Sequence, residues 1–342
     1  MSTEPLPTTA HNRQIAHSCH TGLVLEELLR PLQTYLADDS LTEICINRPG
    51  EIWTEGKTGW QKHSSPMDLA ACERLAMAIA GFSRQHFNAQ HPIVSASLPT
   101  NERIQMVMPP ACQNNTVSMT IRRHSSTDKT LCELEADGAF RTYNAASEKL
   151  QQFETTLLQQ HKKGDIRAFL ETAVASRRNI LIAGKTGSGK TTVAKSLIRL
   201  VPEEERLVTI EDVHELHLKS HPNKVHLFYA GNAGGVTAKE ALASTLRMKP
   251  DRILLAEIRG DEAWEFIKSI NTGHPGAIST IHANSATDAF EQMTAFVKDS
   301  PTGAHLDTGW IRRRLFMTVD IVLFFQNRLL KEIYYDPEKK RQ

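Results

Sequence analysis

The fold is decided by the stretch Gly184-Lys185-Thr186-Gly187-Ser188-Gly189-Lys190-Thr191, which matches the phosphate-loop pattern G-x-x-x-x-G-K-S/T. The apolar run 179–183 before it is typical of a strand, and the segment 192–200 after it is typical of a helix. Strand, glycine-rich loop and helix form the context in which this pattern holds a phosphate group. The stretch therefore predicts a nucleotide site.

The residue types of the loop explain this chemistry. Glycine allows backbone torsions that are closed to other residues, so main-chain N–H groups can surround a phosphate. The start of the helix adds a partial positive charge. We expect Lys190 to reach the β- and γ-phosphates of ATP, and the Thr191 hydroxyl to ligate Mg²⁺. The predicted nucleotide-binding residues of the loop are Gly184, Lys185, Thr186, Gly187, Ser188, Gly189, Lys190, Thr191 and Thr192.

Length and composition narrow the class of protein. The 342 residues are enough for two domains. The 40 Lys+Arg against 39 Asp+Glu give a net charge of +1, so the chain has no overall positive potential that would attract nucleic acid. The five scattered cysteines contain no C-x-x-C pair, so they signal neither a zinc site nor a disulfide framework. The first twenty residues are polar, and the longest apolar run, 321–325, is too short to cross a bilayer. We expect a cytoplasmic protein without an integral membrane segment.

The chain before the loop divides into three parts. Residues 1–22 are polar and aperiodic, which predicts a disordered tail. Residues 23–132 mix helical and strand patterns, which predicts a small α+β domain. Residues 133–164 are polar and predict a linker with one helix near 146–160. In the α+β domain we expect helices at 23–36 and 68–80 and strands at 43–47, 51–54, 103–108 and 116–122.

Residues 165–342 alternate between strand and helix patterns, which predicts an α/β domain with a mostly parallel sheet covered on both faces. A nucleotide site belongs at the carboxyl edge of such a sheet. The expected strands are 179–183, 207–211, 224–229, 253–257, 277–281 and 319–325, and the expected helices are 192–200, 238–248, 261–272 and 285–298.

Two strands end in acids, which hydrolysis needs to hold Mg²⁺ and to orient water. The run 252–257 ends in Glu257, and the run 208–216 contains Glu211, Asp212 and Glu215. Glu257 is the first choice to organise Mg²⁺ and the attacking water, with Glu211 as the other candidate base. Taken alone, the run 252–257 could be a buried strand whose final Glu is merely exposed, and the run 208–216 could be an ordinary solvated strand end.

A third block, 272–284, places His274 and His282 on either side of a strand, with Ser279 and Thr280 inside it. The two hydroxyls can sense a γ-phosphate, and the histidines can act near it. A single histidine is more often structural than catalytic, but a pair that flanks a strand favours a functional block.

These blocks occur in the order and spacing of the traffic ATPases that power bacterial secretion. They resemble the Walker A, Asp box, Walker B and His box of that family, at Gly184–Thr191, Thr209–Leu216, Leu246–Gly260 and Thr272–Ala286. Upstream residues resemble its N-terminal signature: Phe87, Pro92, Leu98-Pro99, Glu102-Arg103-Ile104-Gln105 and Pro109-Pro110. The chain length and short N-terminal domain are similar to the type IV secretion and conjugation branch.

The resemblance implies a RecA-like P-loop core preceded by the smaller α+β domain. It also implies a Mg²⁺-dependent ATPase that forms a homohexameric ring and uses nucleotide-driven domain motion for pilus biogenesis and substrate translocation. Its implied partners are inner-membrane components of a secretion machine, including other secretion ATPases. The implied location is the cytoplasm, in peripheral association with the inner membrane.

Residue roles follow from the same resemblance. The implied catalytic residues are Glu257, Glu211, Lys190 and His282, and the implied metal ligands are Thr191 and Glu257. Arg103 and Arg122 match arginines that close over the nucleotide. Glu215 completes the Asp box and His274 belongs to the His box. Three further arginines are alternative groups for stabilising phosphate charge, among which the sequence does not choose: Arg247, Arg252 and Arg259.

Two other functions fit the phosphate loop. A nucleic-acid translocase or helicase shares the RecA-like core, but the near-neutral charge disfavours it, and direct nucleic-acid binding stays open. A scaffold that binds nucleotide without hydrolysing it is disfavoured by the retained acids.

Overall fold

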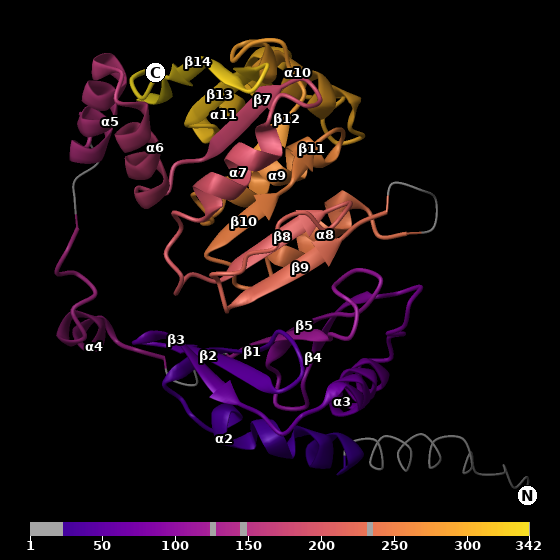
Figure 1. Cartoon of the computed structure of the whole chain (residues 1–342). Coiled ribbons are helices and arrows are strands. Elements are labelled where there is room, and N and C mark those ends of the chain that lie inside the picture. Colours follow the sequence, from indigo (N-terminus) through magenta and orange to yellow (C-terminus); the bar gives the residue numbers. More distant parts are fainter. Residues whose placement is uncertain (1–22, 124–127, 144–148, 231–234, 342) are drawn as a thin grey trace, which may run out of the picture. The chain divides into compact units, whose positions relative to one another are not determined.

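The computed structural model describes residues 23–123, 128–143, 149–230 and 235–341. The chain forms two compact units, Met1–Ser125 and Ser126–Gln342 (Figure 1). The tail expected at 1–22 lies outside the described residues.

The first unit contains a six-stranded sheet in the order β3-β2-β1-β6-β5-β4, and every neighbouring pair is antiparallel. Antiparallel strands can leave one face of a sheet to solvent, so helices are needed on one face only. The strands are β1 Leu41–Ile46, β2 Glu51–Gly56, β3 Gly59–Ser64, β4 Ile93–Ser97, β5 Arg103–Val107 and β6 Ser118–Arg122.

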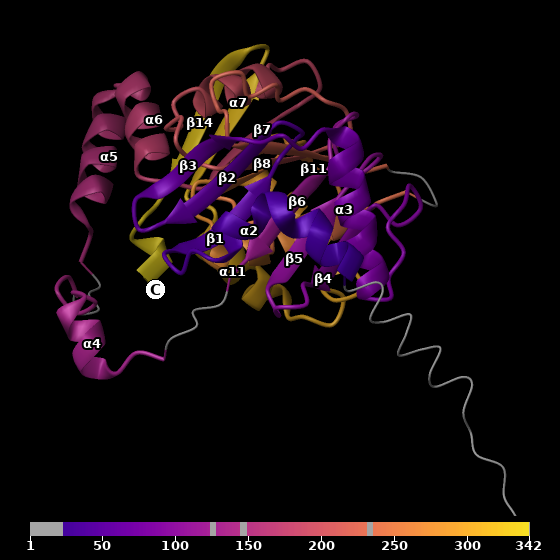
Figure 2. The ribbon, with the colours of Figure 1, turned by 90° about the horizontal axis from the view of Figure 1, so that it is seen from below.

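Helices of this unit cover one face of its sheet (Figure 2). Residues 23–29 are helical, the 3-10 turn η1 (Arg30–Leu32) follows at Pro31, and α2 (Gln33–Leu36) continues the chain. Proline lacks an N–H, which explains the change of helix type at this residue. The other helix, α3 (Leu69–Phe82), is capped by the Asp68 side chain. Apolar side chains of the helices and the strands form one core.

Strands β3 and β4 were not predicted. Both lie at the edges of the sheet and carry several polar, exposed side chains, so neither shows the apolar alternation of a half-buried strand. Edge strands of this kind are therefore difficult to predict from the pattern of apolar residues.

The second unit begins with three helices. They are α4 (Leu131–Ala136), α5 (Gln152–Lys163) and α6 (Ile166–Ala175). The stretch 133–164 thus holds part of α4 and all of α5, two helices where one was expected. Helix α5 ends at Lys163 and is capped by Gly164, whose φ of 72° is left-handed and easily adopted by glycine, and it packs against α6.

Two sheets follow, with the orders β10-β8-β9 and β11-β12-β7-β13-β14. Every pair is parallel except β13 with β14, so the mostly parallel α/β fold is confirmed. The strands are β7 Ile180–Gly184, β8 Leu207–Glu211, β9 Lys224–Phe228, β10 Arg252–Leu255, β11 Glu257–Ile258, β12 Ile278–Ile281, β13 Ile321–Gln326 and β14 Leu329–Tyr335.

One segment joins the two sheets. The strand expected at 253–257 is split at Ala256, so that β10 pairs with β8 and β11 pairs with β12. The Ala256 N–H donates to the carbonyl of Ile210, and its carbonyl accepts from the Thr280 hydroxyl, both at 2.9 Å. Glu257 is consequently the first residue of a new strand rather than the end of an old one.

Helices of the second unit gather in two groups. Helix α6 packs against α7 over the apolar core that includes Ile180 and Ile182, while α9 contacts α8, α10 and α11. None of the helices in the described ranges is long and apolar enough to cross a membrane. The helices are α7 Lys190–Ile198, α8 Ala238–Thr245, α9 Glu262–Asn271, α10 Asp288–Asp299 and α11 Thr308–Thr318, with a final 3-10 turn η2 at Lys339–Arg341.

Candidate active site

The phosphate loop connects β7 to α7. Gly184 ends β7 with a φ of 153°, and a Cβ there would lie 2.3 Å from the carbonyl oxygen of Phe325 and 2.5 Å from Oγ of Ser188. Only glycine fits this position, because the neighbouring backbone atom cannot move aside. The Lys190 ammonium donates to the carbonyls of Gly184 (2.9 Å) and Lys185 (3.2 Å), which holds the loop closed around it.

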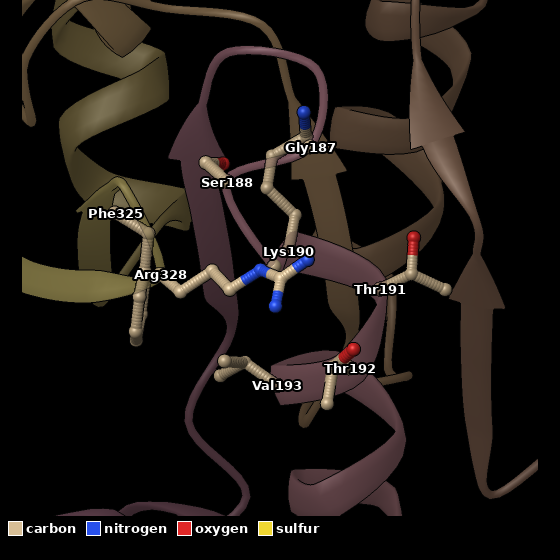
Figure 3. A pocket seen from close by; sticks show the side chains of 9 residues that line it. Gly187, Ser188, Lys190, Thr191, Thr192, Val193, Phe325 and Arg328 are labelled. Atoms are coloured by element: carbon tan, nitrogen blue, oxygen red, sulfur yellow. The ribbon is translucent and has the colours of Figure 1, made fainter.

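A pocket of about 570 Å³ opens beside the loop (Figure 3). Ser188 Oγ is buried and has no hydrogen-bond partner among the described residues, so it is ready to meet an incoming polar group. Burial lowers the pKa of Lys190, an effect that Glu257 opposes and Arg259 reinforces. The pocket is lined by Gly187, Ser188, Gly189, Lys190, Thr191, Thr192, Val193, Phe325 and Arg328. Three of the predicted loop residues lie outside this lining: Gly184, which is buried, and Lys185 and Thr186, which are exposed.

Phe325 and Arg328 were missed by sequence reasoning. Arg328 belongs to the two-residue turn between β13 and β14, and its side chain reaches across the loop toward the start of α7 (Figure 3). A Cβ on Gly189 would lie 3.9 Å from its Cα. Asn327 and Arg328 have φ values of 50° and 64°, as this kind of hairpin turn requires. Such a turn usually carries Asn-Gly. Because an arginine stands in place of the glycine, the sequence predicted neither the turn nor strand β14.

Glu257 stands at the centre of an ionic cluster. Its Oε1 lies 2.9 Å from Nε2 of His282 and 4.0 Å from Nζ of Lys190, and its Oε2 pairs with Arg259. The parallel register of β11 and β12 sets Glu257 opposite Thr280, two residues before His282. The structure therefore brings together Lys190, Glu257 and His282, which are distant in sequence.

Arg259 bridges two acids, because its guanidinium pairs with both Glu257 and Asp212. Burial of the guanidinium opposes its charge, but hydrogen bonds and attraction from these two carboxylates raise the pKa of Arg259. Arg252, in contrast, is buried and paired with Glu205 at 2.7 Å, a structural role, and Arg247 is exposed. Among the three candidate arginines, Arg259 is the one that contacts Glu257.

Glu211 is placed differently from Glu257. It is fully buried, and its carboxylate accepts hydrogen bonds from Thr209 (2.6 Å) and from the N–H groups of Glu215 and Leu216 (both 2.7 Å). Burial alone disfavours the charged form, but hydrogen bonds from His226, Thr209, Leu216 and Glu215 outweigh it and lower the pKa of Glu211. These bonds organise the loop after β8 instead of joining Glu211 to Lys190, Glu257 or His282.

The other polar side chains of the block 272–284 do not bond to the Glu257 carboxylate in the described structure; His274 and Thr280 bond to backbone carbonyls instead. Nδ1 of His274 lies 2.9 Å from the carbonyl of Pro250, and burial lowers the pKa of His274. Thr280 donates to Ala256, and Ser279 Oγ is buried without a hydrogen-bond partner in the described part of the chain. Only His282 of this block contacts the Glu257 carboxylate.

Arg103 and Arg122 belong to the first unit, where the antiparallel register of β5 and β6 sets them directly opposite one another. Both are exposed, and Nε of Arg122 lies 3.8 Å from a carboxylate oxygen of Glu43. Like charges directly opposite on two strands repel one another.

A phosphate loop on a mostly parallel sheet, with an acid that faces its lysine and pairs with a histidine, defines a P-loop ATPase with a RecA-like core. A profile of the family described as type II/IV secretion system protein matches residues 26–323. The VirB11 type IV secretion system protein of Brucella suis biovar 1 is 43% identical over 326 residues, covering 92% of this chain and 90% of that protein. The VirB11 of Bartonella henselae is 43% identical over 343 residues, covering 95% of this chain and 96% of that protein.

A solved structure gives the same result. The crystal structure of the VirB11 ATPase from the Brucella suis type IV secretion system, in complex with sulphate, superposes with a TM-score of 0.88 and 42% identity. The match covers 93% of this chain and 99% of that chain. The chain belongs to the type II/IV secretion system protein family, and within it the chain is a type IV secretion ATPase, an enzyme that hydrolyses ATP. The family that the sequence resembles is thereby confirmed.

Proposed function

We propose that the chain hydrolyses Mg-ATP at the phosphate loop by in-line attack of water on the γ-phosphate, with Glu257 orienting the water. The observation that carries this proposal is the contact of one Glu257 oxygen with both His282 and Lys190, at 2.9 and 4.0 Å. Lys190 marks where the γ-phosphate binds, so an acid beside it can accept a hydrogen bond from the attacking water. Catalysis then rests on positioning and charge stabilisation.

Glu211 takes a supporting role in this proposal. Its carboxylate accepts hydrogen bonds from Thr209 on its own strand and from two N–H groups of the loop that follows, so it is held within that loop, whereas Glu257 faces Lys190. The loop that it holds carries Asp212, which pairs with Arg259. Glu211 thus acts on the site through Asp212 and Arg259.

Magnesium fits the donors present. The Thr191 hydroxyl lines the pocket at the start of α7 and Glu257 supplies a carboxylate oxygen, both of which are hard ligands. When bound, Mg²⁺ would neutralise charge on the β- and γ-phosphates. The unpartnered Ser188 hydroxyl and the main-chain N–H groups of the loop would hold the phosphate oxygens.

We propose that Arg103 and Arg122 add positive charge to the bound phosphates. Their cross-strand pairing supports this role, because an anion relieves the repulsion between two guanidinium groups. We also propose the division into an N-terminal domain (23–132), a linker (133–164) and an ATPase domain (165–342). Nucleotide binding and release would move the two domains relative to one another.

The family membership supports an assembly of six copies at the cytoplasmic side of an inner membrane. There the ring would work with inner-membrane components of a secretion machine, including other secretion ATPases, in pilus biogenesis and substrate translocation. The VirB11 relatives are type IV secretion system proteins, which supports this setting.

ATP turnover and solution mass, each measured with and without Mg²⁺, test the proposal. Wild type should hydrolyse ATP only with Mg²⁺ and form a ring of six. Glu257→Gln should bind ATP but lose at least about a hundredfold in kcat, and Lys190→Ala should lose both binding and turnover. Wild-type turnover by Glu257→Gln would refute the role of Glu257. Turnover that requires single-stranded DNA would instead favour a nucleic-acid motor.

A further inference from the structure

Two imidazoles and a carboxylate meet beside strands β8 and β9, apart from the phosphate loop. Glu211, His214 and His226 each offer one ligand atom, and these atoms all lie within 4.8 Å of one another. Glu211 is fully buried, His226 is 4% exposed and His214 is half-buried. Within the described residues, no other group of three such side chains comes this close.

The register of the two parallel strands builds one side of this cluster. Thr209 on β8 lies opposite His226 on β9, and its hydroxyl donates to Oε1 of Glu211 at 2.6 Å. The same hydroxyl lies 2.8 Å from Nδ1 of His226. Its single hydrogen is used on Glu211, so the hydrogen on Nδ1 of His226 is directed at this hydroxyl and at Oε1 of Glu211, which lies 3.3 Å from Nδ1. A neutral His226 therefore carries its free lone pair on Nε2, and a ring fixed in this way is the usual form of a metal-binding histidine.

His214 supplies an independent sign of a missing partner. Its Nε2 is buried and has no hydrogen-bond partner in the part of the chain that the structure describes. The ring packs against His226 and His217, with centroid distances of 4.6 and 4.7 Å. An unpaired buried ring nitrogen is unfavourable, and a bound cation would satisfy its lone pair.

We propose that Glu211, His214 and His226 bind one transition-metal dication of the zinc class. Two imidazoles with one carboxylate form a ligand set that Zn²⁺ favours and that differs from the all-oxygen set of Mg²⁺. Three protein ligands leave a position for water. The site is separate from the one at which Thr191 and Glu257 would hold Mg²⁺.

A cation here acts on hydrolysis through Glu211, a consequence that rests on the proposed function. Oε2 of Glu211 holds the N–H groups of Glu215 and Leu216 at 2.7 Å. The neighbouring Asp212 pairs with Arg259, which pairs with Glu257. A metal that draws on the Glu211 carboxylate competes with these bonds and shifts the loop that carries Asp212. Metal binding is thus expected to lower turnover.

Cobalt titration of the full-length, chelator-treated protein tests the site directly, because four-coordinate Co²⁺ absorbs strongly in the visible. Wild type should develop this absorption with one equivalent of Co²⁺ and lose it when Zn²⁺ is added. His214→Ala and His226→Gln should each weaken metal binding by at least about tenfold. The matched control is His217→Ala, which removes a ring that touches His214 but is no ligand, and it should bind as wild type does. Circular dichroism checks that each variant is folded.

The sequence has further metal-binding side chains at His11, His17, Cys19 and His20, so the comparison of wild type with His214→Ala is decisive. Equal binding by these two proteins would overturn the site, as would an equal loss in His217→Ala. In a parallel assay, one equivalent of Zn²⁺ should slow ATP turnover of wild type more than that of His214→Ala. Binding without this difference would overturn the link to hydrolysis. A wild type that never turns over ATP would refute the proposed function and leave the metal titration as the test of the site.

Discussion

Nε2 of His282 lies 2.9 Å from Oε1 of Glu257, the carboxylate oxygen that also faces the ammonium of Lys190 at 4.0 Å. The contact joins the segment after β12 to the first residue of β11. It orients the carboxylate, because a ring nitrogen 2.9 Å away favours one position of that oxygen. The histidine is in this respect a positioning residue for the acid.

His282→Ala should lower kcat by about a hundredfold while KM changes little, because a misplaced carboxylate no longer orients water. His282→Gln should retain more activity, since its amide can still donate to Glu257. Steady-state ATPase kinetics measure both. His274→Ala is the matched control, because His274 bonds to the Pro250 carbonyl instead of Glu257. Equal losses in His282→Ala and His274→Ala would contradict the assignment.

Replacing Arg259 should lower the rate of ATP hydrolysis even when the new residue is lysine. One guanidinium pairs with Glu257 and Asp212 together, which a single ammonium on a different stem does not reproduce. We expect Arg259→Lys and Arg259→Ala both to lower kcat, by about tenfold or more. Arg312→Ala, which removes an exposed ion pair with Glu291, should leave kcat unchanged. Recovery of wild-type kcat by lysine would show that charge alone matters at this position.

Two glycines of the phosphate loop should respond differently to alanine. At Gly184 a Cβ would lie 2.3 Å from a backbone oxygen, whereas at Gly187 it would meet nothing within 4 Å. Gly184→Ala should weaken ATP binding by more than about tenfold, because the loop must distort. Gly187→Ala meets only the strain of its φ of 75°, so its loss should be smaller. Calorimetric titration with a non-hydrolysable ATP analogue compares them, and a larger loss at Gly187 would go against the geometry.

Arg328→Ala should raise KM for ATP by about tenfold, the effect of losing one hydrogen bond to a charged group. Arg328 and Lys190 line the same pocket, and two cations there favour a polyanionic ligand. Lys331→Ala on the exposed side of β14 is the control with a similar charge change. Nucleotide affinity that is unchanged in Arg328→Ala would remove this arginine from the site.

Glu211 should make the free energy of unfolding depend on pH in the acid range. Its pKa is lowered in the folded protein, whereas an unfolded glutamate titrates near about pH 4.3. Its contribution is therefore fully present above that pH and is lost as the pH falls through the lowered pKa. Glu211→Gln should cost about 1–3 kcal/mol at neutral pH, because it loses the charge that the surrounding donors stabilise. It should also reduce the loss of stability on acidification. Thermal unfolding from pH 3 to 7 measures both effects, and parallel curves for wild type and variant would argue against this role.

Local signals let the sequence predict most of the second unit. The phosphate loop, the parallel strands and the acids at their ends follow from short patterns, since each depends on neighbours in the chain. Edge strands β3 and β4 escaped prediction because exposure removes their apolar alternation. Helix α11 escaped because Arg312, Arg313 and Arg314 interrupt its apolar face, although Ile311 and Leu315 are buried.

The sequence by itself determined the nucleotide site, the fold class and the family, because glycine spacing and strand order leave few alternatives. Tertiary structure decided which side chains meet. The break at Ala256 starts a new strand at Glu257 and sets it beside His282, while Glu211 is buried under its own loop. Two acids at similar strand ends look equivalent in sequence. Strand pairing separates them, because it determines which carboxylate faces the lysine and which is held by Thr209 and two backbone N–H groups.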